Sequence, residues 1–161
     1  MKPRPAFTLA PALSPADLAA IRDLFRAYAA SLPVDLGYQG FEEELDGLPG
    51  AYAPPHGGLF LAKAADGTPL GSGAFRAMKA GEGCEMKRVY VAPAARGLGL
   101  GIAMVEALFE AARQAGHRRM VLDTLPSMVE AHQLYAKLGF EPIAPYYDTP
   151  VAGTVFLGRD L

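Results

Sequence analysis

The sequence predicts an α/β protein in which a mixed central β-sheet carries helices on both faces. Residues 89–91 form a valine-rich run that is followed by a proline, a glycine-rich turn and a long amphipathic stretch, as in a strand that leads into a helix. Residues 120–124 are near-continuously apolar, which is typical of a parallel strand covered on both faces. The dipeptide Asp66-Gly67 separates two further strands, over residues 59–64 and 69–78, and is a strong hairpin signal.

Length and composition limit the function classes. A chain of 161 residues suits one domain with its own core, so residues 1–161 are expected to form a single domain. The net charge of −2 gives no global field toward nucleic acid or membrane, and no apolar run is long enough to span a bilayer. With one cysteine, Cys84, and three scattered histidines, a metal site is not expected. We therefore expect a cytoplasmic protein that binds no metal, nucleic acid or membrane.

The N-terminal part should contain a short strand over residues 7–10 and then an amphipathic helix. Ser14 is a suitable N-cap, Pro15 fits the first helical position, and Asp17 places a carboxylate in the first turn. The apolar stripe of this helix consists of Leu18, Ile21, Leu24, Phe25 and Tyr28. Residues 31–58 follow a looser pattern that is rich in proline and glycine.

A short helix over residues 41–46 is the one regular element expected in that looser segment. Long irregular segments between strands are often functional.

The C-terminal half should alternate strands and helices. We expect a central strand over residues 84–91, a helix over residues 101–116 that ends at Gly116, and the buried strand over residues 120–124. Ser127 and Glu130 have the spacing of a capping box for a last helix. Residues 146–161 should add one or two antiparallel strands.

The turn Arg96-Gly97-Leu98-Gly99-Leu100-Gly101 suggests an anion site. Its alternating glycines leave backbone N–H groups uncovered and permit positive φ, so successive amides can point into one concavity. The following helix adds its positive end, and Arg96 adds a full charge. This combination is suited to a pyrophosphate. The spacing differs from the dinucleotide fingerprint, and the Gly-Lys-Ser/Thr of a P-loop is missing.

This turn, preceded by Val-x-Val-x-Pro, resembles the R-x-x-G-x-G signature of the GNAT (GCN5-related) N-acetyltransferases. Residues 131–140 are similar to a second signature of the same family, A-x-x-L-Y-x-x-x-G-F. The resemblance implies a sheet whose two central parallel strands splay apart. It also implies an enzyme that transfers the acetyl group of acetyl-CoA, its co-substrate, to the primary amine of a small molecule by direct attack.

The resemblance also implies which residues hold the cofactor. The end of the central strand would contact the pantetheine arm through its backbone, and the turn and the start of the next helix would hold the pyrophosphate. The expected cofactor-binding residues are Val89, Tyr90, Val91, Arg96, Gly97, Leu98, Gly99, Leu100, Gly101 and Ile102.

Two catalytic residues follow from the resemblance. Tyr135 occupies the tyrosine of the second signature, which lies near the thioester sulfur in many members. An ordinary phenol, with a pKa of about 10, is protonated at neutral pH and can donate to a leaving thiolate. Glu85 is the candidate base, because period two puts it on the same side of its strand as Val89 and Val91. A bulge in the strand would break this parity.

Alternatives remain open at the site. Glu85 and Lys87 could instead form a structural ion pair, and Lys87 could bind a carboxylate of the acceptor. Met128 stands where the second signature usually has an asparagine, and the sequence does not decide whether Ser127 or His132 replaces it.

Alternatives also remain for the whole protein. It could be a module of this shape that binds acyl-CoA or a metabolite without turnover, or an enzyme that acetylates a protein lysine or N-terminus. Residues 31–58 are expected to determine the acceptor. A homodimer is compatible with the sequence, which does not fix the oligomeric state.

Overall fold

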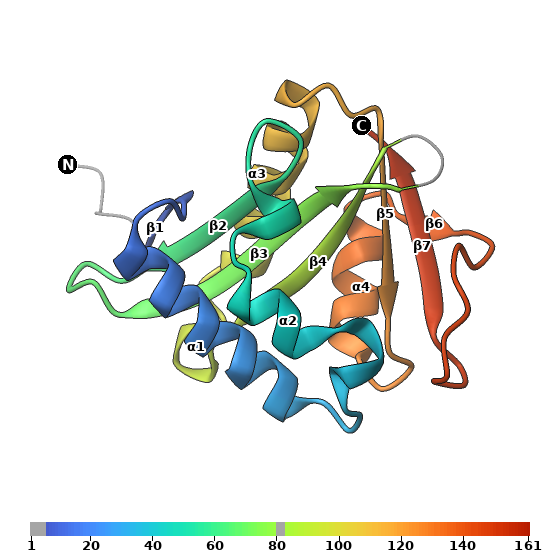
Figure 1. Cartoon of the computed structure of the whole chain (residues 1–161), viewed down its shortest axis with the longest axis horizontal. Helices are drawn as coiled ribbons and strands as arrows, with labels where there is room; N and C mark the ends of the chain where they lie inside the picture. Colours follow the sequence, from blue (N-terminus) through green and yellow to red (C-terminus); the bar gives the residue numbers. More distant parts are fainter. Residues whose placement is uncertain (1–5, 80–82) are drawn as a thin grey trace.

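The computed structural model describes residues 6–79 and 83–161. The strands within these residues form one seven-stranded sheet in the order β1-β2-β3-β4-β5-β7-β6 (Figure 1). The strands are β1 (Thr8–Pro11), β2 (Gly58–Lys63), β3 (Pro69–Ala77), β4 (Cys84–Val91), β5 (Arg119–Thr124), β6 (Glu141–Pro142) and β7 (Val155–Asp160). All neighbours pair antiparallel except β4 and β5, which are parallel.

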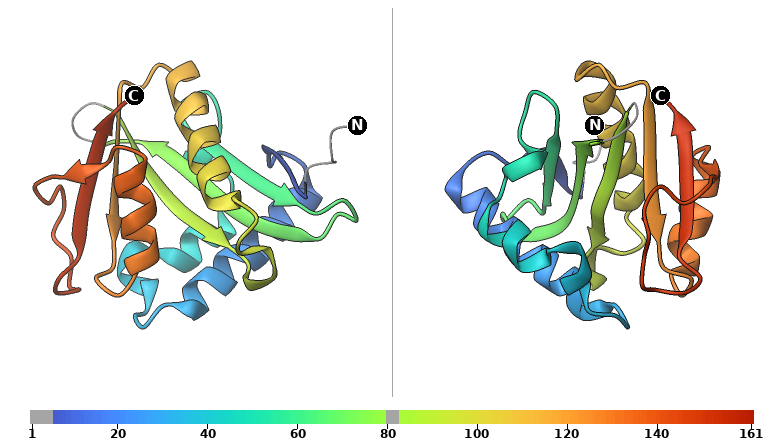
Figure 2. Two further views of the ribbon diagram at one scale, coloured as in Figure 1. Left: turned by 180° about the vertical axis from the view of Figure 1, so that it is seen from behind. Right: turned by 45° about the vertical axis from the view of Figure 1, so that its right-hand side comes forward.

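Helices cover both faces of the sheet, as the sequence predicts (Figure 2). They are α1 (Pro15–Ser31), α2 (Phe41–Asp46), α3 (Leu100–Gln114) and α4 (Val129–Lys137), with short 3₁₀ turns η1 (Leu36–Gln39), η2 (Gly50–Tyr52) and η3 (Pro93–Ala95). The helices α1 and α2 lie on one face, and α3 and α4 lie on the other. None of the described helices is long and apolar enough to cross a membrane.

Each face of the sheet has its own hydrophobic core. On one face, Ile21 and Phe25 of α1 are fully buried and pack with α2 and the β2–β3 hairpin. On the other face, α3 buries Val105 and Leu108 against the sheet. The side of β4 to which a side chain points therefore decides which pair of helices it meets.

The two helix starts predicted from the sequence have different outcomes. The start of α1 is confirmed, because the Ser14 hydroxyl accepts a hydrogen bond from the Asp17 amide (3.1 Å). The predicted capping box of Ser127 and Glu130 is wrong. Ser127 lies in a turn, and α4 begins after Met128, which makes no side-chain cap.

The parallel strands β4 and β5 separate soon after they meet. Their pairing joins Cys84 to Met120 and Glu85 to Val121, yet the strands continue to Val91 and Thr124. Figure 1 shows them diverging from these paired ends. The predicted splayed centre of the sheet is confirmed. Backbone and side chains of both strands are therefore available to line cavities between them.

The strand β4 contains a bulge at Arg88. The three-residue step from Lys87 to Tyr90 faces a two-residue step of β3, and Arg88 has a φ of +60°. This left-handed conformation is strained for an arginine. The Ser72 hydroxyl donates a hydrogen bond to the Arg88 carbonyl (3.0 Å), which helps to hold it. The bulge shifts the alternation of side chains along the strand.

The prediction that Glu85 shares a face with Val89 and Val91 is therefore wrong. The two valines pack on the core under α3 and α4. Lys87, two residues from Glu85 and also before the bulge, points to the opposite face and reaches Gln39 of η1. Glu85 and Lys87 thus belong to the side of the sheet covered by α1 and α2.

Candidate active site

A groove of about 690 Å³ runs along the end of β4, the glycine turn and the start of α3, and is bordered by α4. Nine of the ten predicted cofactor-binding residues line it: Val89, Tyr90, Val91, Arg96, Gly97, Gly99, Leu100, Gly101 and Ile102. The tenth, Leu98, is exposed in the turn and outside the lining. These nine residues therefore form one continuous surface on β4, the glycine turn and the start of α3.

The glycine turn presents free backbone amides to this groove. Gly97 and Gly99 have φ values of +83° and +77°, and a Cβ on either would meet no atom within 4 Å. These glycines are required for their backbone conformation and not because the turn is crowded. The first backbone bond at the start of α3 runs from the Ala103 amide to the Gly99 carbonyl (3.2 Å), so the amides of residues 100–102 have no partner in the helix.

This arrangement fits the pyrophosphate of a coenzyme. The residues that carry the free amides, the positive end of α3 and the exposed Arg96 all line the same end of the groove, where an anion would be stabilised. The splayed edge of β4 offers further backbone groups beside the turn.

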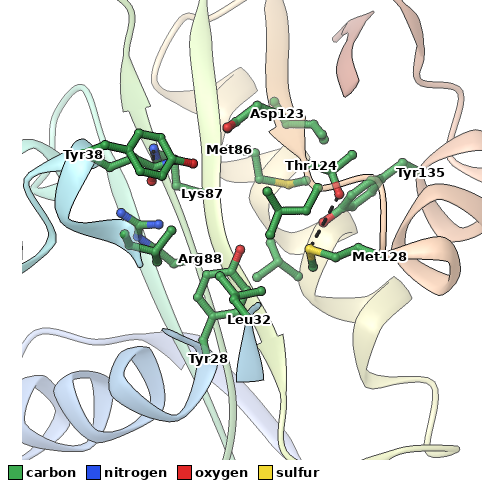
Figure 3. A pocket seen from close by; sticks show the side chains of 15 residues that line it. Tyr28, Leu32, Tyr38, Met86, Lys87, Arg88, Asp123, Thr124, Met128 and Tyr135 are labelled. Carbon is green, nitrogen blue, oxygen red and sulfur yellow. Dashed lines mark hydrogen bonds between the residues drawn. The ribbon is translucent and has the colours of Figure 1, made fainter. Parts of the chain in front are cut away.

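A smaller cavity of about 40 Å³ opens between β4 and β5 on the side of α1 (Figure 3). We call it the central pocket. Its lining consists of Tyr28, Leu32, Leu36, Tyr38, Gln39, Met86, Lys87, Arg88, Val89, Leu122, Asp123, Thr124, Leu125, Met128 and Tyr135. Residues 31–58, which were expected to determine the acceptor, contribute four of these side chains. The lining carries charged residues on both diverging strands: Lys87 and Arg88 on β4, and Asp123 on β5.

Tyr135 lines both the groove and the central pocket. It is buried and packs edge-on against Phe140, with ring centroids 5.6 Å apart. Burial, with smaller contributions from Tyr28 and Asp123, raises the pKa of Tyr135 well above its usual value. The hydroxyl is therefore protonated at neutral pH, which is the state that can donate a proton.

The position where the family signature has an asparagine is occupied by a thioether. Thr124 Oγ1 donates to Met128 Sδ (3.8 Å), and this pair stands beside Tyr135 (Figure 3). His132 Nε2 lies 2.9 Å from the Leu125 carbonyl oxygen, so its ring is held by backbone, while Ser127 borders the groove.

Glu85 is buried and fully engaged. Its Oε1 accepts from Arg76 of β3 (3.0 Å), and its Oε2 accepts from the Tyr146 hydroxyl (2.7 Å). Its ion-pair partner is thus Arg76, so the pairing with Lys87 considered from the sequence is wrong. The carboxylate lies outside the lining of both cavities. Burial, followed by the charge of Glu85, raises the pKa of Tyr146.

The two neighbouring cations of β4 have different partners. Arg88 makes a bidentate ion pair with Glu44 of α2 (2.9 and 3.1 Å), and its guanidinium lies 5.2 Å from the centroid of the Phe41 ring. Lys87 Nζ donates to Gln39 Oε1 (3.2 Å), and Gln39 Nε2 in turn donates to the Tyr38 hydroxyl (3.0 Å).

Sequence reasoning missed several of these groups. Asp123 is the one charged residue in the apolar run of residues 120–124, which could have marked it. It accepts a hydrogen bond from the Tyr147 hydroxyl (2.5 Å). Tyr38 and Gln39 carried no local signal, because they reach the site from a segment without clear periodicity. Among the described residues, no group of three His, Cys, Asp or Glu side chains could hold a metal ion.

A sequence model described as the acetyltransferase (GNAT) family matches residues 19–140. The chain belongs to this family. It is an acetyl-CoA-dependent acyltransferase. An uncharacterized N-acetyltransferase of Schizosaccharomyces pombe is 36% identical over 147 residues, which cover 91% of this chain and 90% of that protein.

Solved structures agree with this family fold. An acetyltransferase of Streptococcus agalactiae superposes with a TM-score of 0.78 at 22% identity, covering 97% of this chain and 99% of that one. The Salmonella typhimurium protein yncA, solved with its cofactor acetyl-CoA, superposes with a TM-score of 0.69 at 22% identity, covering 96% and 94%. At these identities the likeness concerns the fold.

Proposed function

We propose that this GNAT enzyme transfers the acetyl group of acetyl-CoA to the primary amine of a small molecule by direct attack. The observation that carries the proposal is the position of Tyr135, which lines both the groove and the central pocket. A thioester at the end of the groove and an amine in the pocket would meet beside its hydroxyl.

The cofactor would lie in the groove. Backbone groups of Val89, Tyr90 and Val91 would contact the pantetheine arm where β4 has lost its partner strand. Residues 96–102 would hold the pyrophosphate, supported by the free amides, the helix end and the charge of Arg96. When bound, acetyl-CoA supplies an activated acetyl group on a thiol leaving group.

The acceptor would lie in the central pocket. The end of α1 and the turn η1 close this pocket on one side through Leu32, Leu36 and Tyr38. Its volume of about 40 Å³ is small beside that of the groove, so the pocket suits a compact acceptor group. The amine panel below distinguishes a small molecule from a protein lysine or N-terminus.

The chemistry would need three proton movements. The acceptor ammonium would lose one proton, and its nitrogen would then form a bond to the thioester carbonyl carbon while the carbon–sulfur bond breaks. Tyr135 would donate its phenolic proton to the departing thiolate, and the second proton that the nitrogen loses as it becomes an amide would restore the phenol through solvent. We propose Glu85 as the base, acting through an intervening water molecule because both of its oxygens are engaged. Asp123, which opens onto the pocket, is the alternative base.

Release of free thiol from acetyl-CoA, measured across a panel of primary amines with mass analysis of the products, tests this function. The expected result is thiol release that requires an amine and matches the acetylated amine formed. Thiol release that appears only with peptides would contradict the small-molecule acceptor. Release at the same rate with and without any amine would contradict transfer altogether.

A further inference from the structure

Lys87 is a buried cation without an anion. The residue is 8% exposed. Within residues 6–79 and 83–161, no carboxylate oxygen lies within 4 Å of its Nζ. Its hydrogen-bond partner is the neutral amide of Gln39, although an ammonium group has three donors. Burying a charge in this way is costly unless an opposite charge compensates it.

The carboxylates that act on Lys87 are those of Glu85 and Asp123, and within the described residues neither lies within 4 Å of its Nζ. Glu85 is paired with Arg76 and also accepts from Tyr146, whereas Asp123 accepts from the neutral Tyr147 hydroxyl. Burial lowers the pKa of Lys87, while the charges of Glu85 and Asp123 act in the opposite direction. Arg88, the next residue of the strand, is also a buried cation, but it forms a bidentate ion pair with Glu44. A buried cation with a structural role is thus paired on this strand, and Lys87 has no such partner among the described residues.

The unpaired ammonium group stands at the central pocket, where the acceptor is proposed to lie. We propose that Lys87 binds a carboxylate of the acceptor, so that the acceptor class is small molecules that carry both a primary amine and a carboxylate. This inference rests on the proposed function. Gln39 and Tyr38 would position the ammonium group through the chain of hydrogen bonds that joins the three side chains.

The layout of the pocket gives such an acceptor a direction. Lys87 and Tyr38 stand on the β4 side of the pocket, whereas Tyr135 and Thr124 stand on the opposite side (Figure 3). A carboxylate at Lys87 would therefore leave the amine free to extend toward Tyr135 and the thioester. Asp123 would repel a second carboxylate and attract the ammonium form of the amine.

The test uses matched pairs of acceptors that differ only in the carboxylate: glycine and methylamine, β-alanine and ethylamine, γ-aminobutyrate and propylamine, and phenylalanine and phenethylamine. We expect kcat/KM in the full-length enzyme to favour the carboxylate member of each accepted pair by about 10- to 100-fold, the range for a hydrogen bond to a charged group. Lys87→Met should remove this preference by lowering kcat/KM for the carboxylate member of each pair about 10- to 100-fold more than for its carboxylate-free partner. Lys137→Met, which removes an exposed lysine of α4, should keep the preference.

A wild type that uses both members of the pairs equally, or a preference that survives Lys87→Met, would overturn the proposal. Calorimetric binding of the same pairs in the presence of CoA separates this outcome from failure of the proposed function. Absence of thiol release with every amine would defeat the proposed function, whereas Lys87 would still be supported by tighter binding of the carboxylate members that Lys87→Met abolishes. Equal binding of both members, or binding of neither, would also overturn the role proposed for Lys87. A melting temperature of Lys87→Met close to wild type shows that the variant is folded.

Discussion

The groove and the central pocket meet at Tyr135, but they are built from different groups. The groove is formed by the end of β4, the glycine turn, the start of α3 and the facing side of α4, and its anion-binding end consists of backbone amides and Arg96. The pocket is formed by side chains from α1, η1, β4, β5 and α4, and its polar groups are ammonium, carboxylate, amide and hydroxyl.

This difference separates two kinds of recognition. A site of backbone amides needs the right φ values and tolerates changes in most of its side chains, so it suits a ligand shared by many enzymes. A site of side chains changes its ligand whenever one of them changes. We therefore expect substitutions in the turn to act on acetyl-CoA alone, and substitutions in the pocket to act on the acceptor or on the chemistry.

The largest expected effect is on the backbone-built site. Gly99→Asp places a negative charge among the amides and forces an L-residue to a φ of +77°. For wild type, acetyl-CoA at about 100 times its Kd should raise the melting temperature by about 5 to 10 °C. Differential scanning calorimetry should show no such shift for Gly99→Asp.

Gly116→Asp is the matched control for this variant. Gly116 has a φ of +92° and also has no atom within 4 Å of a Cβ, but it lies at the other end of α3. It should lower stability by a similar amount, about 1 to 2 kcal/mol, and keep the full shift with acetyl-CoA. An equal shift in both variants would mean that the turn does not bind the cofactor.

The two adjacent cations should differ sharply in stability. Arg88→Met leaves the partly buried carboxylate of Glu44 without its ion-pair partner and should lower the free energy of unfolding by about 2 to 4 kcal/mol. Lys87→Met loses one hydrogen bond to Gln39 and removes a desolvated charge, so its change should stay within about 1 kcal/mol. Urea unfolding of both variants measures this difference. Similar losses would indicate that Lys87 also has a structural partner.

Removal of the Tyr135 hydroxyl should affect the chemical step. Tyr135→Phe should lower kcat by about 10- to 1,000-fold with little change in acetyl-CoA affinity, because only the proton donor is lost. Burial raises the pKa of Tyr135, which favours the protonated form, so wild type should lose no activity through this group as pH rises to about 10. Steady-state rates from pH 6 to 10 for both proteins measure this. An unchanged kcat with chemistry shown to be rate-limiting would make Tyr135 a packing residue.

The smallest expected effect concerns Glu85. If Glu85 accepts the proton of the amine, Glu85→Gln should reduce kcat/KM most near neutrality and recover partly as pH approaches the pKa of the amine, because free amine is then supplied by the solution. If it only pairs with Arg76, the variant should lose stability but keep the shape of its pH–rate profile. The two profiles, measured with one accepted amine, distinguish these roles. A parallel drop at every pH would count against the base.

The sequence predicts the groove far better than the pocket. The turn and its flanking strand and helix are contiguous in the chain, so glycine chemistry predicted an anion site at Arg96 and Gly99, and the family resemblance added Val91 of the strand before it. The pocket depends on long-range packing: Tyr38 and Lys87 meet across 49 positions of sequence. The bulge at Arg88 was the decisive unknown, because one extra residue turned Glu85 away from the face predicted by simple alternation.

Direct attack is tested most directly by asking whether acetyl-CoA and the amine occupy the groove and the pocket at the same time. Cys84, the one cysteine of the chain, is fully buried, and burial raises its pKa to about 12, so it is unsuited to carry the acetyl group. Direct attack requires acetyl-CoA and the amine to be bound together. Initial rates measured while both concentrations are varied should therefore give intersecting lines in a double-reciprocal plot. Parallel lines, the pattern of an acetylated enzyme intermediate, would contradict the account.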